Sequence, residues 1–467
     1  MIDLSLYKGR RIAVMGLARS GLAAARALAE GGAEVLAWDD GEAGRNAATA
    51  IGMALTDLYN ADLAGVDALV LSPGIPHTFP APHPIAARAK AAGIPIIGDV
   101  ELLARARPDA TYLCITGTNG KSTTTALTGH ILKSAGRAVE VGGNLGIPVL
   151  TFAPLGADGI YVLEMSSYQL ELTPSLGFDA AVLLNITPDH LDRHGGMDGY
   201  IAAKRLAFRA GSAERAGRLP VAILGVDEPN TRAMAGSLRA EGRTVVAIAS
   251  EGRAPGGVHA ADGVLTDETG AAPVAVIDLG ECPALPGRHN WQNACAAYAL
   301  ARAAGVAPDA IAAAMRTFPG LNHRQQAIAV LDGVRFVNDS KATNAAAAAK
   351  ALGCYDAIYW ILGGRAKEGG LAGLESLMPR VRHAFLIGEA TEEFAGWLDG
   401  KVPYSRSGTL DAAVPAAFGQ ARRDGAADPV VLLSPACASF DQYPNFEVRG
   451  DAFVRCVNAL KAGGTAR

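Results

Sequence analysis

The stretch Gly117-Thr118-Asn119-Gly120-Lys121-Ser122-Thr123 constrains the fold of this chain more than any other segment. An apolar run from Tyr112 to Thr116 precedes it and predicts a strand, and the residues from Thr124 to Lys133 predict a helix. A glycine-rich turn between strand and helix lets backbone N–H groups approach phosphate oxygens, with the lysine on the β- and γ-phosphates and the next hydroxyl on Mg²⁺. The general pattern requires glycine at 115, where Ile115 stands, so we expect a shortened ATP-phosphate loop.

The length of 467 residues predicts about three domains, at roughly 150 residues each. Short apolar runs alternate with Ala-rich helical stretches, which is typical of an α/β class with parallel sheets. We expect a Rossmann-like N-terminal domain, a central P-loop ATPase-type domain with a parallel sheet, and a C-terminal Rossmann-like α/β domain. The predicted bounds are 1–99, 100–320 and 321–467, the last boundary at the turn Pro319-Gly320.

The first predicted turn, Gly16 to Gly21, lies between a strand at 11–16 and a helix at 21–30. A dinucleotide fingerprint requires a second glycine at position 18, where Ala18 stands, so an NAD site is disfavoured. Two alternatives remain at this stage: a turn that binds another phosphate at a helix N-terminus, or a helix start without a ligand.

Composition excludes several classes of protein. The net charge is −4 without a long run of one sign, so neither a nucleic-acid surface nor a membrane surface is indicated. No run approaches the roughly 18 apolar residues of a membrane span, and the apolar stretch 12–17 is too short for a secretory signal. The six cysteines include no Cys-x-x-Cys pair and indicate buried thiols in a reducing compartment. We expect a cytoplasmic protein.

Three candidate catalytic side chains follow the phosphate loop. Glu164 ends a predicted strand at 160–164, where a carboxylate could hold Mg²⁺ or merely cap the next helix. His190 and His194 have i,i+4 spacing, but no zinc-protease Glu and no nearby cysteine accompany them, so a role for His190 beside Mg²⁺ or substrate is favoured. Lys204, taken alone, is typical of a solvated helix face.

The third predicted domain contains an Asp332-Gly333 hairpin signal and three polar or small-residue segments that each follow a predicted strand. These segments are 338–344, 363–367 and 434–439. Because the carboxyl ends of parallel strands meet at one edge of a sheet, we expect the segments to form a site for a small polar ligand.

Together these motifs resemble the Mur ligases, the ATP-dependent amide-forming enzymes of peptidoglycan synthesis, whose superfamily also includes folylpolyglutamate synthetases. The loop GTNGKST at 117–123 is common to that superfamily. The segments EMSSYQLE at 164–171, NDSKATN at 338–344 and SPACASFDQY at 434–443 resemble the member that adds D-glutamate to UDP-N-acetylmuramoyl-L-alanine. The resemblance covers essentially the whole chain.

The resemblance implies a cytoplasmic ligase that forms an acyl phosphate and releases ADP and phosphate, and a monomer is expected. It implies that the three domains bind the uridine nucleotide, ATP and the incoming amino acid in that order. The implied catalytic residues are Lys121, Glu164, His190 and Lys204. Lys204 is implied to be carbamylated, and two Mg²⁺ ions are expected on Ser122, Glu164, His190 and Lys204.

The resemblance also implies three sets of binding residues. ATP is expected to contact the loop 117–123 together with Asn293, Arg324 and Asp339. The uridine-linked substrate is expected to contact Arg19, Ser20, Asp39, Gly74, Asn144 and Ser166. D-Glutamate is expected to contact Lys341, Thr343, Lys367, Ser439, Phe440 and Phe446.

Two segments depart from the family pattern. Arg365-Ala366 stands where the family often has an acidic residue, and Gln325-Gln326 replaces an aromatic or Met followed by Glu. Two alternatives also stay open: another ADP-forming Mur-type amide ligase with a different amino acid, or a non-catalytic nucleotide-binding partner. The presence of the four implied catalytic side chains disfavours the second alternative.

Overall fold

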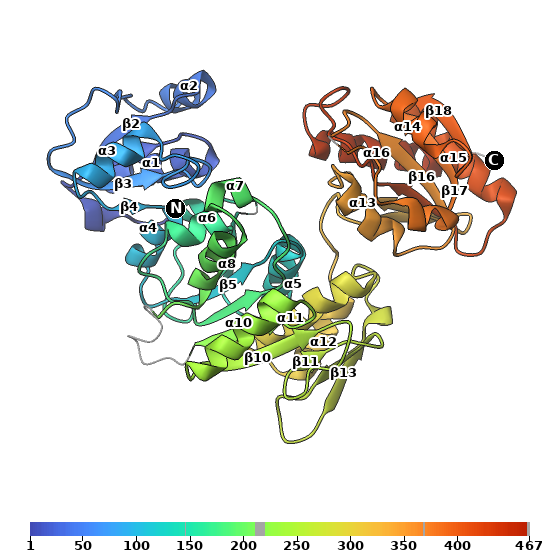
Figure 1. Cartoon of the computed structure of the whole chain (residues 1–467), viewed down its shortest axis with the longest axis horizontal. Helices are drawn as coiled ribbons and strands as arrows, with labels where there is room; N and C mark the ends of the chain where they lie inside the picture. Colours follow the sequence, from blue (N-terminus) through green and yellow to red (C-terminus); the bar gives the residue numbers. More distant parts are fainter. Residues whose placement is uncertain (145, 211–219, 368, 465–467) are drawn as a thin grey trace. The chain divides into compact units, whose positions relative to one another are not determined.

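The computed structural model describes residues 1–144, 146–210, 220–367 and 369–464. The chain divides into two compact units, the first formed by Met1–Leu279 with Asn290–Thr317 and the second by Gly280–His289 with Phe318–Arg467. Strands in the described part of the chain form three sheets, two in the first unit and one in the second (Figure 1). The predicted α/β class is confirmed, while the bounds of the three predicted domains stay predictions.

The first sheet has the strand order β2-β1-β3-β4 and is parallel throughout. Its strands are β1 (Arg11–Met15), β2 (Glu34–Trp38), β3 (Val66–Leu71) and β4 (Ile96–Ile97). The helices of this region are α1 (Arg19–Glu30), α2 (Glu42–Ala50), α3 (Pro84–Ala91) and α4 (Asp99–Ala106). The carboxyl ends of β1, β2 and β3 therefore lie at one edge of the sheet, where α1 begins.

The second sheet has nine strands in the order β13-β12-β11-β10-β9-β8-β5-β7-β6 and is parallel except at β12 and β13. Its strands are β5 (Thr111–Thr116), β6 (Val139–Gly143), β7 (Ile160–Glu164), β8 (Ala180–Leu183), β9 (Val221–Gly225), β10 (Thr244–Ala249), β11 (Val258–His259), β12 (Val264–Asp267) and β13 (Val274–Asp278). The helices are α5 (Lys121–Ser134), α6 (Ser167–Glu171), α7 (Leu191–His194), α8 (Met197–Arg205), α10 (Pro229–Ala240), α11 (Arg288–Ala303) and α12 (Pro308–Arg316).

One apolar core runs from the helices of the first sheet into the second sheet, which explains why both belong to one unit. It contains Leu28 of α1, Leu103 of α4 and Tyr112 of β5, all buried. Backbone hydrogen bonds add to this contact, from Ile2 N to Leu150 O at 2.9 Å and from Gly98 N to Leu172 O at 2.7 Å.

The second unit has a six-stranded sheet in the order β14-β15-β19-β16-β17-β18. Its strands are β14 (Gln326–Leu331), β15 (Val334–Asn338), β16 (Ile358–Gly363), β17 (Val381–Ile387), β18 (Tyr404–Gly408) and β19 (Val430–Leu433). The helices are α13 (Ala345–Leu352), α14 (Thr391–Leu398), α15 (Leu410–Asp424) and α16 (Phe446–Gly464). The predicted hairpin is confirmed, because β14 and β15 pair antiparallel around Asp332 (φ 47°) and Gly333 (φ 79°).

The helix after the phosphate loop begins three residues earlier than predicted, at Lys121. Gly120 takes a left-handed conformation with φ 86° and ends the loop abruptly, so Lys121 and Ser122 already belong to the first turn of α5. The N-terminus of the helix therefore points toward the loop, where its dipole favours an anion. No helix within the described ranges is both long and apolar enough to cross a membrane.

Candidate functional site

The predicted phosphate loop lies between β5 and α5, at the carboxyl end of an interior strand of the nine-stranded sheet. Lys121 folds back over the loop, and its Nζ donates to Gly117 O at 2.9 Å and to Thr118 O at 3.0 Å. Gly120 has φ 86°, a conformation that favours glycine, and a Cβ at this position would also lie 2.3 Å from Asn293 Oδ1. The turn is therefore tight and packs directly against Asn293.

Asn293 reaches the loop from α11, as the sequence prediction for an ATP contact requires. Its Oδ1 accepts a hydrogen bond from Thr124 Oγ1 at 3.3 Å, and its Nδ2 donates to Asn290 Oδ1 at 3.0 Å. The buried amide thus contacts the start of α5 on the side of Gly120.

Asn185 clamps the loop, and sequence reasoning missed it. Its Oδ1 accepts from Asn119 N at 2.8 Å, and its Nδ2 donates to Asn119 O at 3.2 Å. Thr118 is held in a similar way, because its Oγ1 accepts from Thr187 N at 3.0 Å and lies 3.2 Å from the hydroxyl oxygen of Tyr200. Asn185 falls inside the strand predicted at 180–186, whereas β8 ends at Leu183, and a polar residue in that apolar run was the available signal.

Glu164 is the last residue of β7. This strand pairs directly with β5, which leads into the phosphate loop, so Glu164 lies at the end of the strand beside the loop. The residue is 2% exposed. Its Oε1 accepts from Asn144 Nδ2 at 2.8 Å, whereas Oε2 is buried without a hydrogen-bond partner in the described part of the chain. A buried, unpartnered carboxylate oxygen is costly in a protein, and a cation would satisfy it.

Lys204 is not on a solvated face, contrary to its isolated sequence context. It is 1% exposed, and its Nζ donates to Gly117 O at 3.0 Å and lies 4.6 Å from the centre of the Tyr200 ring. Burial, assisted by the positive charge of Lys121, lowers the pKa of Lys204 to about 7. A substantial fraction of this amine is therefore neutral and nucleophilic near neutral pH.

His190 lies at the start of α7 in a left-handed conformation with φ 52°. Its side chain is 51% exposed, and the ring centre lies 5.3 Å from that of Tyr168. Within the described ranges, no three His, Cys, Asp or Glu side chains converge on a point that could hold a metal ion. Mg²⁺ typically takes only one or two carboxylates and completes its shell with substrate phosphates and water, which this set of side chains permits.

A cavity of about 550 Å³ opens at the carboxyl edge of the first sheet. Five of the six residues predicted for the uridine-linked substrate line it: Arg19, Ser20, Asp39, Gly74 and Asn144. Ser166, the sixth, caps α6 by accepting from Gln169 N at 3.2 Å, and Gln169 itself lines the cavity. Asn144 therefore contacts both this cavity and Glu164, joining the two predicted sites.

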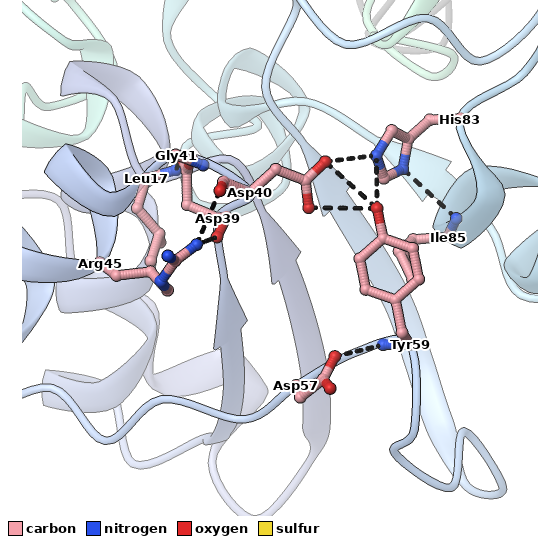
Figure 2. Close-up of polar contacts among 9 residues, drawn as sticks. All are labelled: Leu17, Asp39, Asp40, Gly41, Arg45, Asp57, Tyr59, His83 and Ile85. Atoms are coloured by element: carbon pink, nitrogen blue, oxygen red, sulfur yellow. Dashed lines mark hydrogen bonds and ion pairs between the residues drawn. The ribbon is translucent and has the colours of Figure 1, made fainter.

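The two acids after β2 have different roles in this cavity, as Figure 2 shows. The carboxylate of Asp39 accepts from Leu17 N at 2.5 Å and from Gly41 N at 2.7 Å, which holds the first turn. Asp40 Oδ2 instead lies 2.9 Å from His83 Nε2, and Asp40 Oδ1 accepts from the Tyr59 hydroxyl at 3.1 Å. Asp40 and His83 also line the cavity, although sequence reasoning did not select them.

In the second unit, the three predicted segments follow β15, β16 and β19, whose parallel pairing puts them at one edge of the sheet. Arg449 of α16 ties two of them together. Its buried guanidinium donates to Ser340 Oγ at 3.0 Å, to Ser340 O at 2.8 Å and to Cys437 O at 3.0 Å. Sequence reasoning missed Arg449, since its contacts with Ser340 join positions 109 residues apart.

The residues predicted to bind D-glutamate lie on or near these segments. Lys341 Nζ lies 4.3 Å from the centre of the Phe446 ring, Ser439 is buried and Phe440 is 64% exposed. Thr343 N donates to Lys341 O at 2.8 Å, and Lys367 O accepts from Gly370 N at 3.0 Å. The structure thus brings Lys341, Thr343 and Phe446 together, and places Ser439 and Lys367 on the two neighbouring segments.

The predicted ATP contacts Arg324 and Asp339 belong to the same unit. Burial raises the pKa of Asp339 to about 7, although Arg324 acts in the opposite direction. Asp339 Oδ2 accepts from Ser434 Oγ at 2.9 Å, and Oδ1 accepts from Gln325 N at 3.2 Å. Gln325, one of the departures from the family pattern, thus holds Asp339 through its backbone. The other departure, Arg365, pairs with Glu389 at 3.2 Å.

Comparison with known proteins defines the class. A family model described as the Mur ligase middle domain matches residues 115–301. A solved UDP-N-acetylmuramate-alanine ligase from Thermotoga maritima aligns at 15% identity over 96% of this chain and 99% of that chain, with a TM-score of 0.56. A UDP-N-acetylmuramoylalanyl-D-glutamyl-2,6-diaminopimelate–D-alanyl-D-alanyl ligase from Acinetobacter baumannii aligns at 19% identity over 76% and 79% of the chains, with a TM-score of 0.53. At these identities the solved structures show a common fold.

Two curated proteins match this chain over almost the whole of both sequences. The relative from Paramagnetospirillum magneticum is 54% identical over 100% of each chain, and that from Rhodospirillum rubrum is 55% identical over 98% of this chain and 97% of its own. The chain belongs to the Mur ligase family, as its motifs predicted. Both relatives are named UDP-N-acetylmuramoylalanine–D-glutamate ligase.

Proposed function

We propose that this enzyme joins D-glutamate to UDP-N-acetylmuramoyl-L-alanine at the expense of ATP, in a cytoplasmic step of peptidoglycan synthesis. The names of relatives at 54–55% identity over nearly the full length support the choice of substrates. We further propose that the chain acts as a monomer with three functional domains, at 1–99, 100–320 and 321–467.

One structural observation carries the proposal: the buried Glu164 carboxylate stands beside a complete phosphate loop, with one oxygen unpartnered in the described part of the chain. A phosphate loop alone indicates only nucleotide binding. Here a buried carboxylate stands at the same edge of the sheet as the loop, and the buried Lys204 Nζ lies 3.0 Å from Gly117 O. Such a set of groups indicates a site that stabilises the charge on a phosphoryl group during its transfer.

Amide formation requires that a carboxylate oxygen become a leaving group. The terminal carboxylate of UDP-N-acetylmuramoyl-L-alanine attacks the γ-phosphorus of ATP, which forms an acyl phosphate and releases ADP. The amine of D-glutamate then attacks the acyl carbon, the tetrahedral intermediate loses phosphate, and the nitrogen loses a proton. Lys121, already folded over the loop, is placed to neutralise the phosphates, and the backbone N–H groups of 117–123 hold them.

Mg²⁺ bound at this site would neutralise phosphate charge in the first step. Ser122, Glu164, His190 and Lys204 are the residues that we propose to hold two such ions. The unpartnered Oε2 of Glu164 and the buried position of Ser122 in the first turn of α5 fit this role. A lysine ammonium does not fit it, because a cation repels a metal ion.

Carbamylation removes that conflict. A neutral Lys204 amine attacks CO₂ through its nitrogen lone pair and releases one proton, which converts the side chain into an anionic carbamate. The pKa of about 7 leaves enough neutral amine for this reaction near neutral pH. The carbamate would then act as a carboxylate ligand, and we propose this as the working state of the enzyme.

The substrate-binding residues are assigned from the same proposal. ATP would contact Asn293, Arg324 and Asp339 in addition to the loop. The uridine diphosphate part would occupy the cavity of about 550 Å³, with Arg19 and Ser20 at the N-terminus of α1 on the diphosphate. Lys341 and Lys367 would pair with the two carboxylates of D-glutamate, since both substrates are anionic.

Phosphate release tests the proposal. Purified protein is incubated with ATP, Mg²⁺, UDP-N-acetylmuramoyl-L-alanine and a panel of amino acids, and phosphate release is expected only with D-glutamate. Glu164→Gln is the inactive control. Release with L-lysine or diaminopimelate but not D-glutamate would contradict the assigned substrate. No release with any amino acid would favour a non-catalytic nucleotide-binding role.

A further inference from the structure

His194 is a buried histidine that the mechanism above does not use. It ends α7, and its side chain is 1% exposed. Its Nε2 lies 2.9 Å from Ser167 Oγ, and its Nδ1 lies 3.5 Å from Glu171 Oε1. Nε2 thus faces α6, and Nδ1 is buried beside Glu171 without a hydrogen-bond partner in the described part of the chain. Within the described ranges, no three His, Cys, Asp or Glu side chains converge here to hold a metal ion. The i,i+4 spacing does not produce a chelating pair here.

Two aromatic rings pack against His194. The Tyr168 ring is stacked on it, with centres 5.3 Å apart and an interplanar angle of 20°. The Tyr200 ring is tilted, with centres 5.4 Å apart and an angle of 37°. The imidazole is therefore a spacer between α6, which carries Tyr168, and α8, which carries Tyr200.

Each tyrosine in turn contacts a residue of the proposed metal site. The Tyr168 ring lies 5.3 Å from the ring of His190. The Tyr200 ring lies 4.6 Å from Lys204 Nζ, and its hydroxyl lies 3.2 Å from Thr118 Oγ1 in the phosphate loop. His194 is therefore linked to the proposed ligand His190 through Tyr168, and to the proposed ligand Lys204 through Tyr200.

We propose that His194 is a positioning residue that sets the spacing between His190 and Lys204 by holding Tyr168 and Tyr200 in place. The hydrogen bond to Ser167 and the contact with Glu171 fix the imidazole on α6. The two tyrosine rings transmit its position to the proposed ligands. The inference rests on the proposed function only in treating His190 and Lys204 as ligands.

Residues that orient metal ligands without touching the metal change metal affinity or activity by roughly 10–100-fold when they are replaced. We expect an effect of that size from His194→Ala, which removes the spacer between the two tyrosines. His194→Phe retains a ring of similar shape and loses only the polar contacts with α6. It should therefore bind Mn²⁺ more tightly than His194→Ala, and about as tightly as a variant that lacks only the hydrogen bond to Ser167.

His259 provides the matched control. It is a buried histidine of β11 in the same sheet, and its Nε2 lies 3.9 Å from Glu268. In the strand order, β11 is four positions from β5. His259→Ala should therefore lower the melting temperature without changing the proposed metal site.

The test measures binding as well as rate. Mn²⁺ affinity is measured by electron paramagnetic resonance in the presence of a non-hydrolysable ATP analogue, and the Lys204 carbamate is measured by NMR with ¹³C-bicarbonate. His194→Ala should weaken Mn²⁺ binding about 10–100-fold and reduce the carbamate signal, with an unchanged KM for D-glutamate. His259→Ala should leave both binding readouts at the wild-type level.

Wild-type Mn²⁺ affinity and carbamate signal in His194→Ala would overturn the inference, as would an equal loss in His259→Ala. If His194→Ala does not fold, Ser167→Ala carries the test, with an expected loss of about 3–10-fold in Mn²⁺ affinity from one missing hydrogen bond. Wild-type protein that binds Mn²⁺ but releases no phosphate with D-glutamate would contradict the proposed function and leave the positioning role standing.

Discussion

At the scale of single residues, the candidate site depends on groups whose chemistry is changed by burial. Lys204 and Glu164 are both almost fully buried, and each would be unfavourable there without a partner. The sequence could predict Glu164, because a carboxylate at the end of a strand beside a phosphate loop faces the ligand. It could not predict the burial of Lys204 from local pattern, because the acceptor of its ammonium group is Gly117 O, 87 residues away in the chain.

Gly120→Ala tests the shape of the phosphate loop. The new Cβ would lie 2.3 Å from Asn293 Oδ1 at φ 86°, so the loop or the Asn293 side chain must move. We expect ATP affinity to fall at least about 10-fold, measured by isothermal titration calorimetry, because misplaced N–H groups lose charge-assisted hydrogen bonds.

Gly136→Ala is the control for this substitution, since Gly136 has φ 74° with nothing within 4 Å of its Cβ position. It introduces similar backbone strain, about 1–2 kcal/mol, without the clash. Equal ATP affinities in the two variants would contradict the role assigned to the Gly120–Asn293 contact.

Asp339 predicts a pH dependence of stability. Its folded-state pKa of about 7 lies above the value of roughly 4 expected in the unfolded chain, so the folded state binds more protons between these values. Its contribution to the free energy of unfolding is therefore full below about pH 4 and is lost as the pH rises through 7. Asp339→Asn removes this titration and should raise the melting temperature, relative to wild type, more at pH 8 than at pH 5.

The measurement is calorimetry of the full chain without nucleotide at both pH values. Asp356→Asn is the control, because Asp356 is 88% exposed and its ion pair with Arg380 is at the surface. A melting-temperature difference for Asp339→Asn that is the same at pH 5 and pH 8 would show that the carboxyl group is not protonated in the folded state.

At the scale of elements, a fully buried strand was the most predictable. The strand predicted at 160–164 agrees with β7, because all of its residues are buried in a mostly apolar run at the length of a strand. No strand was predicted within 220–280, where β9 to β13 lie. β13 is at the edge of the sheet, and three of its five residues are exposed, including Val274, so no buried apolar run marks it.

Asn185→Ala tests whether the segment after β8 supports the phosphate loop. The substitution removes both hydrogen bonds to the backbone of Asn119, whose N–H and C=O groups would then bond to water. We expect KM for ATP to rise about 10-fold, because each lost hydrogen bond contributes about 0.5–1.5 kcal/mol. The rate at saturating ATP should change less, since the loop can still close around bound phosphates.

Asn60→Ala is the matched control, because Asn60 donates to Asp57 in an exposed loop at 2.7 Å. KM for ATP is measured for both variants by steady-state kinetics. If KM for ATP is unchanged in Asn185→Ala, the loop is fixed by Thr118 and Lys121 without the amide clamp.

At the scale of the whole molecule, the proposed ligands are divided between the two compact units. The phosphate loop, Glu164, Lys204 and the cavity belong to the first unit, and the proposed D-glutamate residues belong to the second, together with the proposed ATP contacts Arg324 and Asp339. The order of motifs along the chain predicted three domains, and their bounds stay predictions. The contacts of Arg449 and Asn185 could not be predicted, because each joins segments that come together only in the folded sheets.

This division predicts that substrate affinities can be changed separately. Lys341 Nζ lies over the Phe446 ring in the second unit, where we propose that it pairs with a carboxylate of D-glutamate. Removing a charge-assisted contact of this kind costs about 1.5–3 kcal/mol, so Lys341→Ala should raise KM for D-glutamate roughly 10–100-fold. Affinity for an ATP analogue, which is held mainly by the phosphate loop of the first unit, should stay within about two-fold of wild type.

Lys401→Ala separates the proposed role from a general loss of lysine packing. Lys401 Nζ lies 4.7 Å from the centre of the Trp397 ring in the same unit, so it makes an equivalent cation–π contact away from the predicted segments. Its replacement should leave both affinities unchanged. If Lys341→Ala instead weakened binding of the ATP analogue and left KM for D-glutamate unchanged, Lys341 would belong to the nucleotide site, and the separation of substrates between the units would be wrong.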